Sequence, residues 1–448
     1  MRKKSLLPII ILIICVALTA CILPTLLNGG DSRIDDWVDT LGGLINGEEP
    51  EEFTYRDPEP YVPVTTAPAP VPTSVRENEE EVITIVDEAQ DDVPEDDAAS
   101  TVEDDTELIK KLAAERYYAY GTLSQEERRI YRAIYTTLFN FGGKTPMGTL
   151  DSDMIGKAYD CVMADNPELF YVKGYNMVRY MRGSKLESIS ISGIYNMEKD
   201  DVAGHQARVD AYIDTCLAGA PQGIDEYEKI KYLYEYIIKN TEYDLNAENS
   251  QNCLSVFENG RSVCQGYAEA MQYLMIRMGM MCTVVRGVTN KGETHAWNLV
   301  RSNGDYYYVD ATWGDMSYEI RTGEDLAQLP QMPEVSYEYL CVTTDEISRT
   351  HTPDDTFVLP QCVARYDNYY VRSGNYFTEV NDAQLRSVFD NAYANGDSFV
   401  SIKCSDPMVY SDMMDYLTGE GHLYDYLYRD GTVNYMYLDK LNEVIFYI

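Results

Sequence analysis

The chain has 448 residues, of which 45% are hydrophobic, and a formal net charge of −38. Its length predicts two or three domains, with enough apolar material for packed cores. Residues 31–107 hold 25 acidic residues against three arginines, so more than half of the net charge falls in one stretch. This balance argues against nucleic acid as a partner, because the phosphates would be repelled, and against docking on an anionic lipid surface by charge.

Residues 1–28 are expected to form a signal peptide or a membrane anchor. The start Met-Arg-Lys-Lys precedes an apolar run from Leu6 to Leu27, which is the layout of a secretory leader. Leu18-Thr-Ala-Cys21 resembles a bacterial lipobox, which would be cleaved before Cys21 and lipidated on it. The apolar run continues past Cys21, however, and is long enough to span a bilayer uncleaved. Both alternatives tether the rest of the chain to the outer side of the cell membrane.

Residues 29–107 are expected to form a disordered stalk. Six prolines lie between positions 58 and 72, and they favour extended chain. The acidic stretch 77–107 has no aromatic residue and cannot bury enough apolar surface to fold. Repulsion between its charges would extend the stalk and hold the folded part away from the membrane.

Residues 108–220 are expected to form an N-terminal α+β extension. Ser124-Gln-Glu-Glu127 is a capping box, which marks the start of a helix. Two strand-like runs separated by Arg182-Gly-Ser predict a hairpin. Further helices are expected at about 152–163 and 203–217, and the strands at about 170–181 and 186–194.

Residues 221–320 contain the strongest chemical signal, and we expect them to be the catalytic core. After a turn at Asn259-Gly260, apolar residues recur at helical spacing from Cys264 onward, so Cys264 lies in the first turn of a helix. The helix dipole favours a thiolate at this end. The backbone N–H of Cys264 is unpaired by helix geometry and can donate to an oxyanion. Most of the other cysteines are expected to be buried thiols.

A histidine and an aspartate follow in a predicted hairpin. The chain has only four histidines: His205, His295, His351 and His422. A strand beginning at His295 turns at Asn303-Gly304, the strongest short hairpin signal, and returns as far as Thr312. A turn centred on these two residues pairs Thr312 with His295. Asp310 then lies on the same face as a diagonal neighbour of His295, about 7–8 Å away between backbones.

These three side chains predict covalent thiol catalysis. His295 would take or hold the thiol proton, and Asp310 would orient the imidazole ring. Asp315 is an alternative orienting residue, but it lies beyond the predicted strand end. The reaction class is acyl transfer through a thioester, with water as acceptor in a peptidase or amidase and an amine as acceptor in a crosslinking enzyme.

Cys264-Gln-Gly-Tyr-Ala, His295-Ala-Trp-Asn and Asp310-Ala-Thr-Trp resemble the three core motifs of the transglutaminase-like superfamily. This resemblance covers about residues 225–316. Weaker similarity to bacterial extracellular members extends to Asp165-Asn-Pro-Glu-Leu-Phe-Tyr, to Thr344-Asp-Glu and His351, and to Leu359-Pro-Gln-Cys362. The core resemblance implies a papain-like α+β core in which a helix bearing the cysteine packs on an antiparallel sheet bearing the histidine and the aspartate. It also implies that the three residues form a catalytic triad.

No cofactor and no metal are expected. Animal transglutaminases use calcium, but no calcium loop such as an EF-hand is visible in this sequence. The cysteines and histidines also lack the spacing of a zinc site.

Substrate contacts are expected from Gly266, Tyr267, Trp297 and Trp313. Gly266 has no side chain that would block a substrate backbone. For the two tryptophans, the alternative is a place in the core and in the wall of a groove. His351 is expected to be structural or on the surface.

The remaining residues, 321–448, are expected to form a small C-terminal α/β region. Its predicted strands lie at about 337–344, 364–371, 399–403, 433–437 and 443–448, and its predicted helices at about 380–394 and 406–417.

The sequence as a whole predicts a membrane-tethered extracellular enzyme that acts on amide bonds of a protein or a cell-wall peptide. Hydrolysis is slightly favoured over crosslinking, because water is the default acceptor. The alternative is a non-catalytic binding or scaffold protein of the cell surface with the same fold. A complete triad argues against this alternative, because a binding module does not need all three groups.

Overall fold

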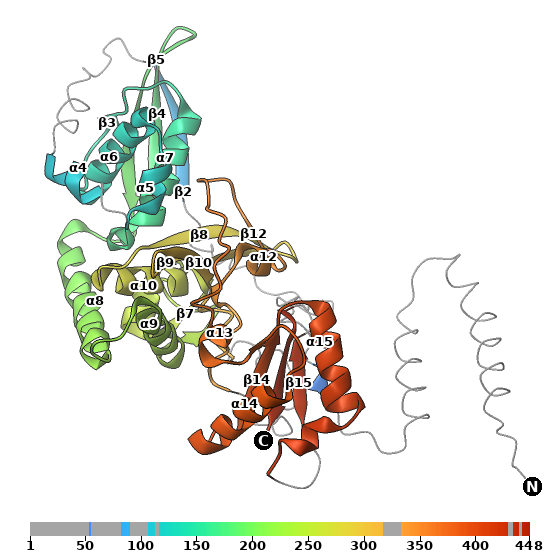
Figure 1. Cartoon of the computed structure of the whole chain (residues 1–448). Coiled ribbons are helices and arrows are strands. Elements are labelled where there is room, and N and C mark those ends of the chain that lie inside the picture. Colours follow the sequence, from blue (N-terminus) through green and yellow to red (C-terminus); the bar gives the residue numbers. More distant parts are fainter. Residues whose placement is uncertain are drawn as a thin grey trace, which may run out of the picture.

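A computed structural model of the chain describes residues 53–54, 82–89, 106–112, 116–316, 333–428, 433–438 and 441–448. The expected leader, with Cys21, and most of the expected stalk lie outside these residues. Figure 1 shows three folded units in succession: an N-terminal α+β unit, a central unit and a C-terminal unit. Among the described residues, no helix is both long enough and apolar enough to cross a bilayer.

The N-terminal unit packs helices on one four-stranded sheet. Its helices are α4 (Thr106–Leu112), α5 (Tyr118–Thr122), α6 (Gln125–Phe139) and α7 (Ser152–Asp165). Its sheet has the order β2 (Val82–Ala89), β4 (Val172–Arg182), β5 (Lys185–Tyr195) and β3 (Thr145–Pro146). The capping box predicted at Ser124 is present, with Glu127 N–H donating to the serine hydroxyl and Ser124 N–H donating to the glutamate.

Strand β2 corrects the expectation of a disordered stalk at residues 82–89. It pairs in parallel with β4 along its whole length, and Asp87 forms an ion pair with Arg179 of β4 at 2.7 Å. The β-branched residues Val82, Ile83 and Ile85 favour a strand. The many acidic residues on both sides of this run favoured the prediction of disorder over that of a strand.

The N-terminal unit is fastened to the central unit by a buried carboxylate, Asp165. It accepts hydrogen bonds from the backbone N–H groups of Ala119 and Tyr120 at 3.1 and 2.8 Å. It also accepts one from the Thr283 hydroxyl of the central sheet at 3.3 Å. Burial raises the pKa of Asp165 to about 7, although these donors act in the opposite direction.

The central unit has the predicted papain-like α+β arrangement. Its helices are α8 (Lys199–Gly219), α9 (Glu226–Asn240) and α10 (Cys264–Arg277). Its antiparallel sheet has the order β11 (Leu340–Val342), β10 (Asp305–Val309), β9 (Thr294–Ser302), β8 (Cys282–Thr289) and β12 (His351–Pro353). Helix α10 packs on this sheet, where Asn298 of β9 donates to the carbonyl oxygen of Ala268 at 2.9 Å.

The β9–β10 hairpin has the predicted register but a shorter second strand. Asp305 pairs with Ser302, and the pairing continues to Val309 opposite Asn298. The turn residues Asn303 and Gly304 both have positive φ, 51° and 96°, as a type I′ turn requires. Strand β10 ends at Val309 instead of Thr312, because its pairing with β11 shifts register there.

The C-terminal unit has its own five-stranded sheet and its own core. The sheet order is β1 (Phe53–Thr54), β15 (Tyr435–Leu438), β16 (Glu443–Tyr447), β14 (Phe399–Cys404) and β13 (Tyr376–Phe377). Its main helices are α14 (Asp382–Asn395) and α15 (Pro407–Met414). The strand predicted at 364–371 is wrong: the helix α13 (Tyr369–Ser373) begins there, because the Asn368 side chain caps it by accepting from Tyr370 N–H.

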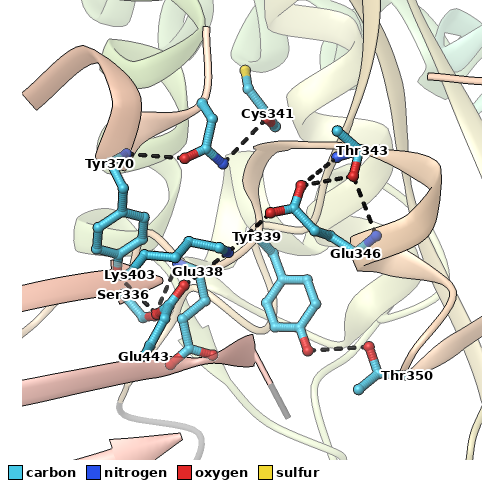
Figure 2. Close-up of polar contacts among 11 residues, drawn as sticks. Ser336, Glu338, Tyr339, Cys341, Thr343, Glu346, Thr350, Tyr370, Lys403 and Glu443 are labelled. Carbon is cyan, nitrogen blue, oxygen red and sulfur yellow. Dashed lines mark hydrogen bonds and ion pairs between the residues drawn. The ribbon is translucent and has the colours of Figure 1, made fainter. Parts of the chain in front are cut away.

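A buried lysine joins the C-terminal unit to the central unit, as Figure 2 shows. Lys403 of β14 lies 2.9 Å from the Glu443 carboxylate and 3.4 Å from that of Glu346. Glu346 belongs to the short helix α12 (Thr344–Ile347), which follows β11 of the central sheet. Tyr370 donates its hydroxyl proton to Glu443 at 2.9 Å. A strand of one unit is thus ion-paired with a helix of the other.

Candidate active site

Cys264 is the first residue of α10, as the sequence predicts. The residue before it, Val263, is extended, and the loop turns at Gly260, whose φ of 61° lies in the left-handed region that glycine adopts without strain. Cys264 is partly exposed, whereas the other seven cysteines of the described part of the chain are buried. The thiol at the positive end of the helix is therefore also the accessible one.

Gly266 packs against the loop before Cys264 and does not face a substrate site. It is buried, and a Cβ atom at this position would lie 2.0 Å from the Ser262 hydroxyl oxygen and 2.9 Å from the Asn252 carbonyl oxygen. The expectation of a substrate contact at Gly266 is therefore corrected. The absence of a side chain lets the loop pack directly against the first turn of α10.

His295 and Asp310 meet in the buried corner between β9 and the end of β10. His295 Nε2 lies 2.7 Å from Asp310 Oδ2, and their side chains are 6% and 1% exposed. The other carboxylate oxygen of Asp310 accepts from the backbone N–H groups of Thr312 and Trp313 at 2.9 and 3.2 Å. These two backbone donors hold the carboxylate toward the imidazole. The other candidate, Asp315, instead accepts a hydrogen bond from Tyr267 at 2.7 Å.

The charges at the site favour an imidazolium between a carboxylate and a sulfur. Burial alone would lower the pKa of His295, but the Asp310 carboxylate and the Cys264 thiol both hydrogen-bond to the ring and raise its pKa to about 10. Burial would raise the pKa of Asp310, but His295 and His351 hold it well below its usual range. Since Nε2 of His295 is bound to Asp310, Nδ1 is left for the sulfur. An imidazolium that is hydrogen-bonded to a sulfur stabilises a thiolate.

His351 also belongs to this site, which the sequence did not reveal. It lies on β12, is 1% exposed, and its Nε2 lies 3.1 Å from Asp310 Oδ2. Its Nδ1 lies 2.8 Å from the Thr350 hydroxyl, which in turn lies 3.1 Å from the Tyr339 hydroxyl. Of the two alternatives expected for His351, the surface position is wrong and the structural one is confirmed. The sequence signals were the scarcity of histidines and the weaker family similarity at His351. Neither placed His351 beside Asp310, because β12 reaches the sheet through long-range pairing.

The side-chain nitrogen and oxygen atoms of His295, Asp310 and His351 lie within 4.8 Å of one another, a spacing that metal ligands also have. The two nitrogen–oxygen distances to Asp310, 2.7 and 3.1 Å, are those of N–H···O hydrogen bonds. These bonds account for the cluster, and we assign no metal to it.

Of the aromatic residues expected to contact substrate, only Trp313 is partly exposed. Its ring packs against His351 and His295, with centroid distances of 4.5 and 5.6 Å. Tyr267 and Trp297 are buried, at 0% and 1% exposure. The expectation of substrate contacts at these two residues is corrected: they are part of the core around the site, which was the alternative for Trp297.

A cleft of about 370 Å³ borders the segments that bear Cys264 and His295. Its lining includes Gln265 and Thr294, the chain neighbours of Cys264 and His295. Much of the remaining lining comes from the N-terminal unit, at the end of α7 and the start of β4. The site is therefore bounded by two units. Residues of the motif that begins at Asp165, among them Asn166 and Pro167, line the cleft.

Comparison with known proteins gives a family match for part of the central unit. The model of the Transglutaminase-like superfamily matches residues 218–311. Kyphoscoliosis peptidase of Homo sapiens is 25% identical over 148 residues, which cover 29% of this chain and 22% of that protein. Kyphoscoliosis peptidase of Mus musculus is 20% identical over 245 residues, which cover 49% of this chain and 35% of that protein. The matches thus span about a fifth to a third of the length of these relatives.

Among solved structures, the crystal structure of a TGase is 14% identical and covers 36% of this chain and 55% of its own, with a TM-score of 0.24. The family match rests on the segment that bears Cys264, His295 and Asp310. Residues 218–311 therefore resemble transglutaminase-like domains, and at the level of that superfamily the match supports cysteine-based chemistry.

Proposed function

We propose that this protein is a thiol enzyme that cleaves amide bonds through a thioester, with Cys264, His295 and Asp310 as its catalytic residues. The observation that carries the proposal is the alignment of the three groups: a partly exposed thiol hydrogen-bonded to an imidazole that is held by a buried carboxylate. This is the arrangement that thiol acyl transfer requires.

In the first step, the Cys264 thiolate attacks the carbonyl carbon of the amide. The negative charge moves to the oxygen, where the N–H groups at the start of α10 can stabilise it. When the oxyanion collapses, the carbon–nitrogen bond breaks, and His295 gives its proton to the leaving amine. The acyl group remains on the sulfur as a thioester, and the imidazole of His295 is now neutral.

In the second step, His295 takes a proton from the acceptor as it attacks the thioester, and the sulfur leaves as thiolate. With water as the acceptor the product is a carboxylic acid, and with an amine it is a new amide. We favour water, because it is the more abundant acceptor. The substrate that we propose is a protein or a cell-wall peptide.

We further propose that the enzyme works on the outer side of the cell membrane. The support is the arrangement of residues 1–28, in which basic residues precede a long apolar run. A tether of this kind would confine the enzyme to substrates close to the membrane.

Selective alkylation tests the activated thiol. At pH 7, iodoacetamide is expected to modify Cys264 much faster than the other cysteines, and peptide mass spectrometry would locate the label. His295→Ala should slow this modification, whereas His422→Ala should leave it unchanged, because His422 lies in the C-terminal unit beside Asp425. Uniform labelling of all cysteines, or equal rates in wild type and His295→Ala, would contradict the proposal.

A second assay separates the two acceptors. A glutamine-containing peptide is supplied together with a fluorescent primary amine, and the products are resolved by mass spectrometry. Release of the acid with no incorporation of the amine is expected for a hydrolase. Incorporation that competes with hydrolysis would identify a crosslinking enzyme with the same catalytic residues.

A further inference from the structure

The cleft beside Cys264 has walls suited to a peptide. Its lining carries the amide side chains of Gln251, Asn252 and Asn196, and amides pair well with a peptide backbone. Asn252 Oδ1 already accepts from Leu254 N–H and Asn196 Nδ2 already donates to the Phe170 carbonyl oxygen, so Asn252 would offer its N–H groups and Asn196 its oxygen. Apolar residues of the N-terminal unit, among them Leu169 and Phe170, complete it. A volume of about 370 Å³ lies in the range of sites that enclose small ligands.

The charge of the cleft is opposite to that of the chain. Lys173 of β4 and Arg286 of β8 both contribute to the lining, against a single carboxylate, Glu269. Glu269 is 8% exposed and accepts hydrogen bonds from Cys253 N–H at 3.1 Å and from the Gln265 amide at 2.8 Å. Both carboxylate oxygens of Glu269 thus accept hydrogen bonds from the protein, and in the lining two cations stand against one carboxylate.

Lys173 is the cation that remains available to a ligand. It is partly exposed, and within the described part of the chain it forms no ion pair. In a protein with a net charge of −38, an ammonium group at the edge of a cleft attracts anions where the rest of the chain repels them.

We propose that this cleft binds the acyl-donor side of a peptide substrate and selects a carboxylate close to the scissile amide, with Lys173 as the group that recognises it. The inference rests on the proposed function, because it takes Cys264 as the nucleophile. The substrate class is therefore an acidic peptide, and the N-terminal unit determines specificity through β4.

Two peptidyl chloromethyl ketones test this inference without knowledge of the natural substrate. Acetyl-Glu-Ala and acetyl-Gln-Ala chloromethyl ketones differ only in the charge of one side chain, and each alkylates a thiol at its acyl-donor side with loss of chloride. The ratio of their second-order rate constants at Cys264 is expected to be about 10 in favour of glutamate, roughly 1.4 kcal/mol. Lys173→Gln should reduce this ratio to near 1, and Lys173→Glu should invert it.

Lys185→Gln is the matched control, because Lys185 lies at the far end of the β4–β5 hairpin and is 78% exposed. It should keep the wild-type ratio. If iodoacetamide labels Cys264 selectively but the two ketones react equally, the acidic subsite is wrong and the proposed function stands. If iodoacetamide shows no selectivity for Cys264, the proposed function falls and the subsite with it.

The imidazoles of His295 and His351 share one carboxylate oxygen of Asp310. Nε2 of His295 and Nε2 of His351 lie 2.7 and 3.1 Å from Asp310 Oδ2, so both rings donate to it. The Thr350 hydroxyl lies 2.8 Å from Nδ1 of His351, and a hydroxyl proton pointed at this nitrogen fits a neutral ring. Burial lowers the pKa of His351, against the effect of Asp310, which agrees with a neutral ring.

We infer that His351 is a positioning residue that limits how strongly Asp310 holds the proton of His295. Its N–H competes with His295 for the same oxygen and so weakens the carboxylate as an acceptor. A His295 that held its proton too firmly would be a poor acid toward the leaving amine and a poor base toward water. The groups that face this oxygen are His295 and His351, with Tyr339 connected through Thr350.

The titration of His295 tests this role in the absence of substrate. With Cys264 capped as a methyl disulfide, imidazole NMR gives the pKa of His295. His351→Leu is expected to raise it by about one pH unit, the effect of one hydrogen bond to a charged group. His351→Gln, which can still donate an N–H to Asp310, should stay near the wild type. A purely structural role would alter stability in both variants and leave this pKa unchanged, which would contradict the inference.

Discussion

At the residue scale, the site depends on one carboxylate that is surrounded by donors. Asp310 accepts from two backbone N–H groups and from two imidazoles. Since its pKa is held well below its usual range, it stays ionised in a buried position. A buried anion with four donors is both fixed in position and able to stabilise a neighbouring cation.

Asp310→Asn removes that charge at almost constant volume. The pKa of His295 is expected to fall from about 10 toward its ordinary value, because the carboxylate that raises it is lost. Cys264 then loses the cation that stabilises its thiolate, and iodoacetamide alkylation at pH 7 should slow by about 10²-fold. Asp345→Asn, an exposed change at α12, is the control and should keep the wild-type rate. An unchanged rate in Asp310→Asn would remove Asp310 from the mechanism.

The same pair makes stability depend on pH. A histidine with a raised pKa binds its proton more tightly in the folded state than in the unfolded state, where its pKa is about 6.5. The stabilisation by the Asp310–His295 pair is therefore fully present below pH 6.5 and is lost as the pH rises to about 10. In urea unfolding between pH 6 and 10, the unfolding free energy should fall more steeply with rising pH in the wild type than in Asp310→Asn. Parallel pH profiles would show that the pair does not contribute.

At the element scale, short-range signals predicted what lies within one element or one hairpin. Asn303-Gly304 determined the register that puts His295 and Asp310 together, and helical spacing from Cys264 predicted the start of α10. The orientation of Gly266 and the position of His351 were not predictable in this way. Gly266 faces a loop that is folded back by contacts around Ser262, and His351 reaches the site through strand pairing with β8.

The close packing of that loop on α10 predicts the effect of one methyl group. In Gly266→Ala, the new Cβ would lie 2.0 Å from the Ser262 hydroxyl oxygen and 2.8 Å from that of Ser255, so the loop must move. Overpacking of this kind costs ~1–3 kcal/mol of unfolding free energy, and Cys264 alkylation should slow because the loop precedes it. In the control Gly204→Ala, at an exposed position of α8, stability should rise by up to ~1 kcal/mol. In denaturant unfolding, the change in unfolding free energy should be negative for Gly266→Ala and positive for Gly204→Ala. Equal changes in the two variants would show that Gly266 is not closely packed against the loop.

At the scale of the whole molecule, the central unit is bounded by two others that contribute differently. The N-terminal unit supplies a wall of the cleft, and the C-terminal unit supplies Lys403 to Glu346 of α12, a few residues before His351. Figure 2 shows how this lysine lies between Glu346 and Glu443. The sequence contained no sign of it, because Lys403 sits in an ordinary apolar strand, and only the tertiary fold buries it to 2% exposure.

Lys403→Met tests whether this ion pair holds the two units together. It leaves two buried carboxylates without a cation, which costs ~3–5 kcal/mol of unfolding free energy. The pKa of Glu443 is already raised, chiefly by burial and in spite of Lys403. Without the lysine it must rise further, so the folded variant binds a proton there that the unfolded chain releases above about pH 4.5. The loss of stability should therefore be small near pH 5 and grow toward pH 8 in denaturant unfolding.

Two further variants separate this effect from a general loss of packing. In Lys403→Met/Glu443→Gln, the uncompensated charge at Glu443 is gone while the amide oxygen can still accept from Tyr370, so part of the stability should return at pH 8. Lys185→Met removes an exposed lysine and should cost little at either pH. If Lys403→Met loses the same stability at pH 5 and pH 8, the methylene packing of the lysine and not its charge joins the C-terminal unit to α12. In that case the charge of Lys403 does not hold α12 in place through Glu346. The alkylation rate of Cys264 should then be the same whether position 403 is charged or neutral.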